Sequence, residues 1–405
     1  MGSVVIIGGG AAGLTAAIAA AMCGDSVTVL ERMDRVGKKI LATGNGRCNL
    51  MNTGEMRFPG GSDLAKTVLT RFGAQEQTQF WQAMGLRTRQ EDGGRVYPIS
   101  GAATTVLDTL RQAMRLLNVK TMTGATACEI RRNRKGWLVQ ADKAYVADRV
   151  IVAGGGCAQP KLGSDGSAYP LLTALGHSLV PLRPALTQIV TETGPIRGLS
   201  GIRVRCDVSL TNAQGEKVRQ QGELLFADYG VTGVCVMQCA RWAQAGDVMH
   251  INLARALGFD GCEDLAEELV RRRDAWGQGM TQLDLLTGLC VPKLGIALMR
   301  AAGLEKVSDR PAEQLNDRTL RRIAALTADF CLKVTGVKGF DNAQVTAGGV
   351  CSEEFDPVTL ESRFTPGVHA AGEVLDVDGD CGGYNLMFAF GSGILAGLNG
   401  RRAPW

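Results

Sequence analysis

The sequence predicts an α/β fold with a parallel sheet that binds a dinucleotide, and three features support this prediction. A short apolar run at residues 3–7 is followed by the pattern G-x-G-x-x-G at residues 8–13. An alanine-rich segment then leads to a second apolar run, residues 26–30, which ends at an acidic residue. A second glycine-rich segment covers residues 369–397. Together these features predict one dinucleotide held from both ends of the sequence.

Each glycine of the first pattern has a separate physical role. Gly8 permits a tight turn after the strand, Gly10 lets the backbone approach a pyrophosphate, and Gly13 lets helix and strand pack closely. The following helix begins near Ala11 and Ala12, and its free N–H groups and dipole favour phosphate there. This segment is therefore predicted to form a Rossmann-like nucleotide-binding turn.

The acid at the end of the second strand indicates which nucleotide is bound. Glu31 follows Gly8 by 23 residues, about where a carboxylate accepts a ribose hydroxyl, and Arg32 follows it. A carboxylate at this position favours an unphosphorylated ribose.

The next elements follow from apolar periodicity and from turn residues. Residues 35–52 form a loop rich in Gly and Asn that includes Lys38, Lys39 and Arg47, which suits a pyrophosphate or a flavin edge. Residues 148–153 form another buried strand, which ends in Gly154-Gly155-Gly156. The other expected elements are helices at 62–84 and 102–117 and strands at 119–130, 136–141 and 144–147.

The middle of the chain has a different character. Residues 187–252 alternate apolar and polar residues, which predicts a β-rich module. Residues 260–333 show helical periodicity, including helices over 262–275 and 318–332. We therefore expect a discontinuous cofactor domain, 1–186 and 340–405, with an inserted β-rich module, 187–255, and a small helical domain, 256–339.

Composition narrows the class of protein. Apolar residues make up 45% and charged residues 21%, as in globular enzymes, and the formal charge of +4 does not demand an anionic partner. The 12 cysteines form no C-x-x-C pair and no zinc-spaced cluster with histidine, so we expect no metal site, no disulfide scaffold and a reducing cytoplasm. Cys235 and Cys239 are expected to be buried thiols. No membrane span is predicted, and the oligomeric state is left open.

The C-terminal glycine-rich segment predicts the other half of the site. A short strand leads into Gly372-Glu373, and Gly382-Gly383 opens a helix over 384–398. A helix N-terminus near a flavin pyrimidine ring would stabilise the negative charge that develops on reduction. Glu373 could accept a hydrogen bond from a ribityl hydroxyl.

With these residues in place, the chain resembles a flavoprotein family of the two-dinucleotide-binding-domain superfamily, the NAD(P)/FAD-dependent or aminoacetone-oxidase-like oxidoreductases. The resemblance covers nearly the whole chain. Its marks are GKKILATGNGRCNLMN (37–52), GRVYPIS (94–100), GGGCAQPKLGSDGSAY (154–169), GELLFADYGVTG (222–233), TAGGV (346–350) and GEVLDVDGDCGGYNLMFAFGSG (372–393).

The resemblance implies an FAD domain interrupted by a β-barrel-like module and a small helical domain. Relatives have been associated with NAD(P)H-dependent flavin reduction, with steps on bile acids and with uridine reduction in large-subunit ribosomal RNA. The expected FAD contacts are Gly8, Gly10, Ala11, Ala12, Gly13, Glu31, Arg32, Lys39, Gly44, Gly46, Arg47, Cys48, Asn49, Gly154, Gly155, Gly372, Glu373, Gly383, Tyr384 and Asn385.

The chain departs from the family pattern in one segment. Ala227-Asp228 stands where relatives often have Thr-His, and Gly233-Val234 where they have a Gly-Pro-type turn. A substrate role for that histidine is thus in doubt here. No second G-x-G-x-x-G unit occurs between residues 157 and 340, so NAD(P)H is expected to visit the flavin transiently.

Three residues are candidates for proton transfer beside the flavin. Cys48 lies in the GNGRCN loop, where Arg47 could tune its pKa. Cys381 precedes the C-terminal helix, where a thiolate would be favoured, and Tyr384 begins that helix. We expect His177, His250 and His369 to be structural residues.

Three functions remain open on the sequence. The first is an FAD oxidoreductase that uses NAD(P)H and acts on a small molecule through hydride transfer at flavin N5. The second is reduction of uridine to dihydrouridine in ribosomal RNA, for which the basic runs 131–135 and 271–273 would need to share one face. The third is a flavin-binding protein without turnover.

Overall fold

The computed structural model describes residues 2–405, and these fall into two compact units. The first unit combines residues 1–184 with 340–405, and the second comprises residues 185–339. The α/β fold class with an inserted barrel is confirmed. None of the described helices is long and apolar enough to cross a bilayer.

The first unit is built on a five-stranded parallel sheet in the order β19-β10-β1-β2-β6. The N-terminal strand β1 lies at its centre, and Ile6 pairs with Ile151 on one side and with Val29 on the other. The apolar residues of these strands are buried because both faces of the sheet are covered. The strands are β1 (Ser3–Ile7), β2 (Ser26–Glu31), β6 (Lys120–Thr123), β10 (Arg149–Val152) and β19 (Val368–Ala370).

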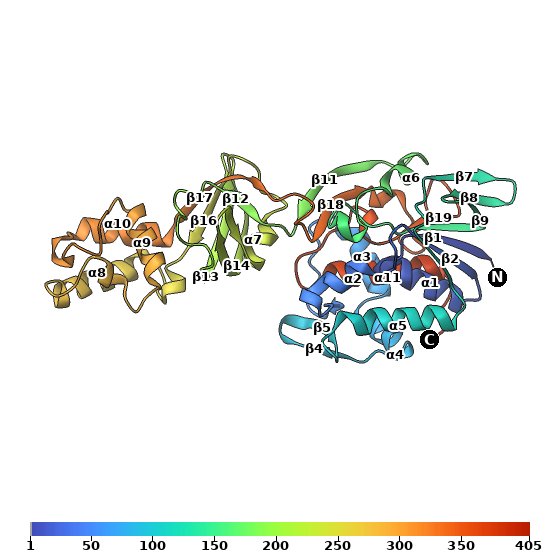
Figure 1. The fold of residues 1–405 in the computed structure, drawn as a ribbon, viewed down its shortest axis with the longest axis horizontal. Helices are drawn as coiled ribbons and strands as arrows, with labels where there is room; N and C mark the ends of the chain where they lie inside the picture. The colour runs from blue at the N-terminus through green and yellow to red at the C-terminus, as the bar shows by residue number, and fades with distance from the viewer. Residues whose placement is uncertain (1) are drawn as a thin grey trace. The chain divides into compact units, whose positions relative to one another are not determined.

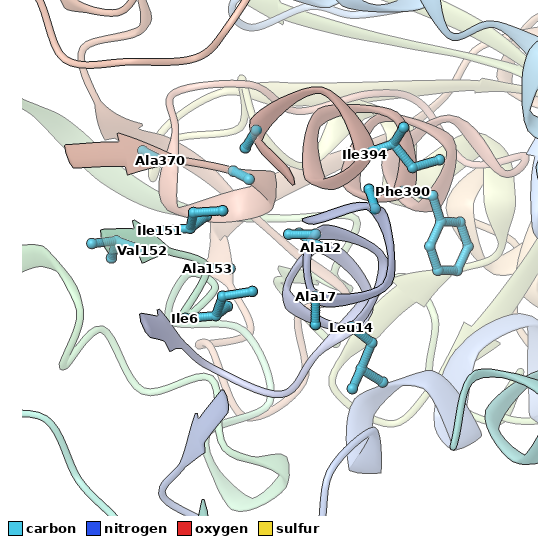
Figure 2. Packing of buried hydrophobic residues seen from close by; sticks show 14 of the residues in the cluster. Ile6, Ala12, Leu14, Ala17, Ile151, Val152, Ala153, Ala370, Phe390 and Ile394 are labelled. Atoms are coloured by element: carbon cyan, nitrogen blue, oxygen red, sulfur yellow. The ribbon is translucent and has the colours of Figure 1, made fainter. Parts of the chain in front are cut away.

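Two helices from opposite ends of the chain pack against each other beside this sheet. Helix α1 (Ala11–Met22) contacts α11 (Tyr384–Leu398) along most of its length. Figure 2 shows Phe390 and Ile394 of α11 next to Ala12 of α1, with the strand residues beside them. The remaining helices of this unit are α2 (Lys38–Ala42), α3 (Ser62–Arg71), α4 (Ala74–Ala83), α5 (Ala103–Leu116) and α6 (Tyr169–Thr173).

Smaller sheets complete the first unit (Figure 1). One is an antiparallel meander of β7 (Glu129–Asn133), β8 (Gly136–Gln140) and β9 (Ala144–Ala147). A second consists of β3 (Met51–Asn52), β5 (Arg95–Pro98) and β4 (Thr88–Gln90), and a third pairs β11 (Leu179–Ala185) with β18 (Val345–Val350).

The second unit is a closed six-stranded barrel with a group of helices beside it (Figure 1). Its strands are β12 (Ile189–Thr191), β13 (Arg203–Asn212), β14 (Gly215–Ala227), β15 (Gly230–Thr232), β16 (Val248–Asn252) and β17 (Phe330–Val337). Its helices are α7 (Val234–Cys239), α8 (Cys262–Trp276), α9 (Pro292–Ala301) and α10 (Asp317–Ala328).

Three expected elements differ from the structure. The helix expected over 318–332 ends at Ala328, and Phe330 begins β17, in which buried and exposed residues alternate with the period of a strand. The helix expected over 62–84 is two helices, because Gly73 begins a new one. The strand expected over 119–130 is split between β6 and β7, which belong to different sheets.

His369 gives the first unit a specific pH dependence. It is fully buried on β19, and burial together with the positive charge of nearby Arg149 lowers the pKa of His369 to about 4. In the unfolded chain this histidine has an ordinary pKa of about 6.5. At pH values between the folded and unfolded pKa, the unfolded chain therefore binds a proton that the folded protein does not bind. Stability is lost as the pH falls through this window, by about 2 kcal/mol between pH 7 and pH 5.

The variant His369→Asn tests this dependence by denaturant unfolding at pH 7 and pH 5. Asparagine keeps a donor for the carbonyl of Thr359, which His369 Nδ1 contacts at 3.0 Å, but does not titrate. We expect the variant to lose about 2 kcal/mol less than the wild type over this range. Equal losses in both proteins would contradict the assignment.

Candidate cofactor-binding site

The turn after β1 contains three glycines in different surroundings, and the protein itself requires glycine at two of them. A Cβ on Gly8 would lie 2.4 Å from the carbonyl oxygen of Ala153, and one on Gly13 would lie 1.9 Å from the carbonyl oxygen of Gly8. Gly10 is different, because a Cβ there would meet no protein atom within 4 Å. Its φ of −87° suits any residue. Gly10 therefore borders open space, as expected where a pyrophosphate approaches the backbone.

The same turn presents the N-terminus of α1. Gly10 caps this helix without a side-chain hydrogen bond, and the first turn carries no acidic residue. The leading N–H groups, at Ala11 and Ala12, are thus not blocked by a capping side chain, and the helix dipole favours an anion. These residues fit the phosphates of FAD.

The acid after β2 is held in place by backbone N–H groups. Glu31 is buried, and its two carboxylate oxygens accept from Gly9 N at 2.8 Å and from Met33 N at 2.7 Å. Each oxygen keeps a further lone pair for a ribose hydroxyl. Arg32 forms an ion pair with Asp165 and lowers the pKa of that carboxyl, although burial opposes this shift.

Lys39 and Glu373, which are 334 positions apart in the chain, meet in the structure. Lys39 Nζ lies 2.6 Å from Glu373 Oε2, and the backbone N–H of Thr346 donates to Glu373 Oε1 at 2.8 Å. The Thr346 hydroxyl oxygen accepts from the N–H groups of Cys157 and Ala158 at 2.8 and 3.1 Å. This network ties α2, β18 and the segment after β19 to the loop that follows β10, where Gly154 and Gly155 lie.

The loop after α2 turns sharply and leaves one polar atom unpartnered. Gly44, Asn45, Gly46 and Cys48 all have positive φ values, between 55° and 82°. Asn49 follows, and its buried Oδ1 has no hydrogen-bond partner. A buried acceptor of this kind fits a donor on a bound group such as the flavin.

The same asparagine lies beside the start of α11. A Cβ on Gly383 would come within 2.9 Å of Asn49 Oδ1 and 2.7 Å of the carbonyl oxygen of Met51. Gly383 has a φ of +105° and caps α11 without a side-chain hydrogen bond. The two glycine-rich ends of the chain are therefore joined through this loop, within the first unit.

Several expected contact residues also have clear roles within the protein. Arg47 donates to Glu91 at 2.5 Å, and its guanidinium lies over the ring of Tyr97 at 4.1 Å. The side-chain amide of Asn385 exchanges two hydrogen bonds of 2.8 Å with the backbone of Gly379. These two side chains brace the loops on either side of the site.

The proton-transfer candidates are less exposed than the sequence suggested. Cys48 is fully buried, and burial raises its pKa to about 12. The expected lowering of the Cys48 pKa by Arg47 does not occur, because the effect of burial dominates, and the guanidinium of Arg47 pairs with Glu91. Burial also raises the pKa of Cys381 and that of Tyr384, which packs edge-on against Phe58. A thiolate at Cys381 is thus disfavoured, contrary to the expectation from the helix N-terminus.

The histidines and the 271–273 run form contacts of their own within their units. His177 is buried between Phe355 and Phe364 and contacts Glu354 and Ser362, each at 2.8 Å. His369 is buried with Nε2 unpartnered, so it is less fully satisfied than expected. His250 lies on the barrel in the second unit. The guanidinium groups of the 271–273 run pair with Glu268, Asp274 and Asp317.

Sequence reasoning missed Asn52, which links three loops. Its Nδ2 donates to the carbonyl oxygens of Gly93 and Gly382 at 3.1 and 2.9 Å, and its Oδ1 accepts from Gly54 N at 2.8 Å. Asn52 therefore fixes the segment that leads into α11. Its place at the end of the GNGRCNLMN motif was the available signal.

We expect Asn52→Leu to destabilise the first unit by about 1–3 kcal/mol, because three backbone groups lose a buried partner. The FAD affinity should fall as well, because Gly382 precedes the helix cap. Thermal unfolding and flavin titration check this, with Asn342→Ala, at an exposed turn position, as the control. An unchanged unfolding temperature and an unchanged FAD affinity in Asn52→Leu would show that these contacts contribute to neither stability nor binding.

Comparisons with known proteins place the chain in a family. The family model described as the HI0933-like protein Rossmann domain matches residues 2–399. A 3-dehydro-bile acid delta(4,6)-reductase of Clostridium scindens is 37% identical and aligns over 100% of both chains. The ribosomal RNA dihydrouridine synthase of Escherichia coli is 26% identical over 96% of this chain and 95% of its own length. That of Haemophilus influenzae is also 26% identical, over 98% and 97%. The chain therefore belongs to the HI0933-like family of Rossmann-fold flavoproteins, which are flavin-dependent oxidoreductases.

Proposed function

We propose that the protein binds one FAD in its first unit and reduces a carbon–carbon double bond conjugated to a carbonyl in a small molecule. NAD(P)H is the proposed electron donor. The observation that carries the proposal is the open space at Gly10, at a helix N-terminus that no side chain caps, opposite the Glu31 carboxylate on the second strand.

The substrate class follows from chemistry that the three relatives share. The Clostridium scindens relative is named for reduction of an oxidised bile acid with 4,6 double bonds, and the Escherichia coli and Haemophilus influenzae relatives are named for formation of dihydrouridine. In both cases a double bond conjugated to a carbonyl is saturated. The substrate gains a hydride at the β-carbon and a proton at the α-carbon, and the two electrons come from NAD(P)H.

The residues of the chain have defined tasks in this reaction. Bound FAD would supply hydride transfer through its N5 atom. The N-terminus of α1 and Gly10 would hold the pyrophosphate, Glu31 a ribose hydroxyl and Glu373 a ribityl hydroxyl, with Lys39 keeping the Glu373 carboxylate in place. The N-terminus of α11, capped by Gly383, would favour negative charge on the pyrimidine ring of the flavin.

The proton needs a separate donor. We propose Cys381 for this role, with Tyr384 as the alternative, because both lie at the start of α11, the helix end that would face the flavin. Both side chains carry a proton at neutral pH, and burial raises the pKa of each further. The thiol of Cys48 is fully buried, so we assign Cys48 to packing of the loop. Cys381→Ser should slow the substrate half-reaction and leave the FAD content unchanged.

The charge of the inserted unit favours a small molecule over RNA. Residues 186–340 contain 19 basic and 18 acidic residues, a net charge of +1. Binding to RNA depends on cations free to contact phosphates, and the arginines of the 271–273 run are already paired with carboxylates. The 37% identity to the bile acid reductase, against 26% for the RNA enzymes, supports the same choice.

Anaerobic half-reactions test the proposal. The yellow holoenzyme should bleach with NADH or NADPH, and the reduced protein should regain its colour on mixing with a 3-keto-4-ene steroid but not with the saturated 3-ketosteroid. The RNA reaction would be favoured instead if neither compound reoxidises the flavin and if the protein restores dihydrouridine in the ribosomal RNA of a strain that lacks the gene. Flavin that no nicotinamide reduces would indicate a protein without this turnover.

A further inference from the structure

Three potential metal ligands meet on the outer surface of the barrel in the second unit. His250 lies on β16, Cys331 on β17, and Asp329 directly before β17 at the end of α10. One ligand atom from each lies within 4.8 Å of the other two. All three reach solvent, because His250 is half-buried and the other two are exposed. Spacing in the sequence predicted no metal site here, since His250 and Cys331 are 81 positions apart.

The register of the barrel strands creates this arrangement. His250 and Cys331 are directly opposite partners in the antiparallel pair β16–β17, so their side chains lie side by side on one face. Their neighbours Met249, Ile251 and Leu332 point into the barrel core and are fully buried. The backbone positions of both ligands are therefore fixed by a sheet rather than by a loop, which suits a preorganised site.

A fourth residue orients the imidazole ring. Thr211 on β13 lies with its Oγ1 2.8 Å from His250 Nε2 and 3.4 Å from the carbonyl oxygen of Val248. Either nitrogen of a neutral imidazole ring can carry the proton. With the proton on Nε2, the Thr211 hydroxyl oxygen accepts from it, and Nδ1 presents its lone pair to a metal ion beside the carboxylate and the thiol. Metal-binding histidines are held by a second hydrogen bond of this kind.

One ring nitrogen of His250 is within reach of both other ligands. His250 Nδ1 lies 2.7 Å from Asp329 Oδ1 and 3.4 Å from Cys331 Sγ. The three ligand atoms therefore lie close enough together to contact one metal ion, and the carboxylate of Asp329 would attract a cation bound between them.

We propose that His250, Asp329 and Cys331 bind a zinc ion, with water as the fourth ligand. Nitrogen, oxygen and sulfur in one set favour zinc over the harder magnesium or calcium ions. Bonds of about 2.0–2.3 Å at tetrahedral angles place ligand atoms roughly 3.3–3.7 Å apart. The Nδ1–Sγ separation already fits, and the exposed Asp329 side chain needs to move back by about 0.6 Å. Binding releases the thiol proton of Cys331 to solvent, and no oxidation or reduction is involved.

Metal binding to the FAD-loaded, full-length protein tests the proposal. The chain has other cysteines, so the zinc stoichiometry is compared with that of matched variants. We expect one zinc ion per chain, and loss of that site in Cys331→Ser and His250→Gln. Cys128→Ser, which removes another exposed cysteine, should keep it. Thr211→Val keeps all three ligands and should weaken zinc binding about 10–100-fold.

Cobalt provides a readout that a purely structural role for these residues would not change. Co²⁺ in the site should give a thiolate-to-metal charge-transfer band that is absent in Cys331→Ser and retained in Cys128→Ser. Flavin content and flavin reduction should be the same in all variants, so a failure of this site is distinguishable from a failure of the flavin chemistry. No zinc bound to the wild type, or equal binding in the wild type and Cys331→Ser, would overturn the proposal.

Discussion

Gly393→Ala is expected to destabilise the first unit by about 2–3 kcal/mol, although alanine is normally the better helix former. Gly393 lies where α11 crosses α1, and a Cβ there would come within 2.2 Å of the carbonyl oxygen of Ala12 and 2.4 Å of Thr15 Oγ1. Because a backbone carbonyl cannot rotate away, the two helices must separate. Gly397 meets α1 in the same way, with a Cβ 2.4 Å from the carbonyl oxygen of Ala16.

Urea unfolding followed by tryptophan fluorescence measures this loss. Trp81 packs edge-on against Phe390 of α11, with ring centroids 4.9 Å apart, so its emission reports on the packing of this helix. Gly194→Ala is the matched control, because a Cβ there meets nothing within 4 Å, and its effect should stay within about 0.5 kcal/mol. A Gly393→Ala variant with the same free energy of unfolding as the wild type would mean that the two helices do not cross this closely.

Gly10→Val is expected to abolish FAD binding without unfolding the protein. A Cβ at Gly10 would meet no protein atom within 4 Å, and the local φ of −87° suits valine, so the apoprotein should keep its stability within about 0.5 kcal/mol. The same side chain fills the space where the pyrophosphate would approach, so the FAD affinity should fall at least about 100-fold, or about 3 kcal/mol.

Gly13, a second glycine in the same turn, allows an effect on folding to be distinguished from an effect on FAD binding. Gly13→Ala places a Cβ 1.9 Å from the carbonyl oxygen of Gly8, so this variant should lose both stability and FAD. Flavin fluorescence titration and thermal unfolding of both variants distinguish the two roles. Tight FAD binding by Gly10→Val would contradict the placement of the pyrophosphate at this turn.

The parts of the site that depend on residues close together in the chain were predictable from the sequence. The strand, glycine turn, helix and acid from residue 3 to Glu31 form one continuous segment, and each of its constraints acts over a few residues. The helix after Gly383 was expected at the bounds that the structure shows. Local patterning also predicted the β-rich character of the inserted segment.

Features that depend on long-range contacts were not predictable. No local pattern brings Lys39 to Glu373, or shows that Arg47 is captured by Glu91 instead of acting on Cys48. The end of α10 was misplaced because Phe330 and Leu332 continue the apolar spacing of the helix, yet they face the core as alternate residues of a strand. The meeting of His250 and Cys331 depends on barrel register, which a sequence does not reveal without the pairing of its strands.

The flavin stoichiometry of the purified protein tests the central claim most directly. The protein should carry, or take up on reconstitution, one FAD per chain, release it intact as the dinucleotide on denaturation, and bleach under anaerobic conditions with NADH or NADPH. A folded chain that holds no FAD after reconstitution, or that binds FMN equally well, would contradict a dinucleotide held between the Gly10 turn and the Gly383 helix.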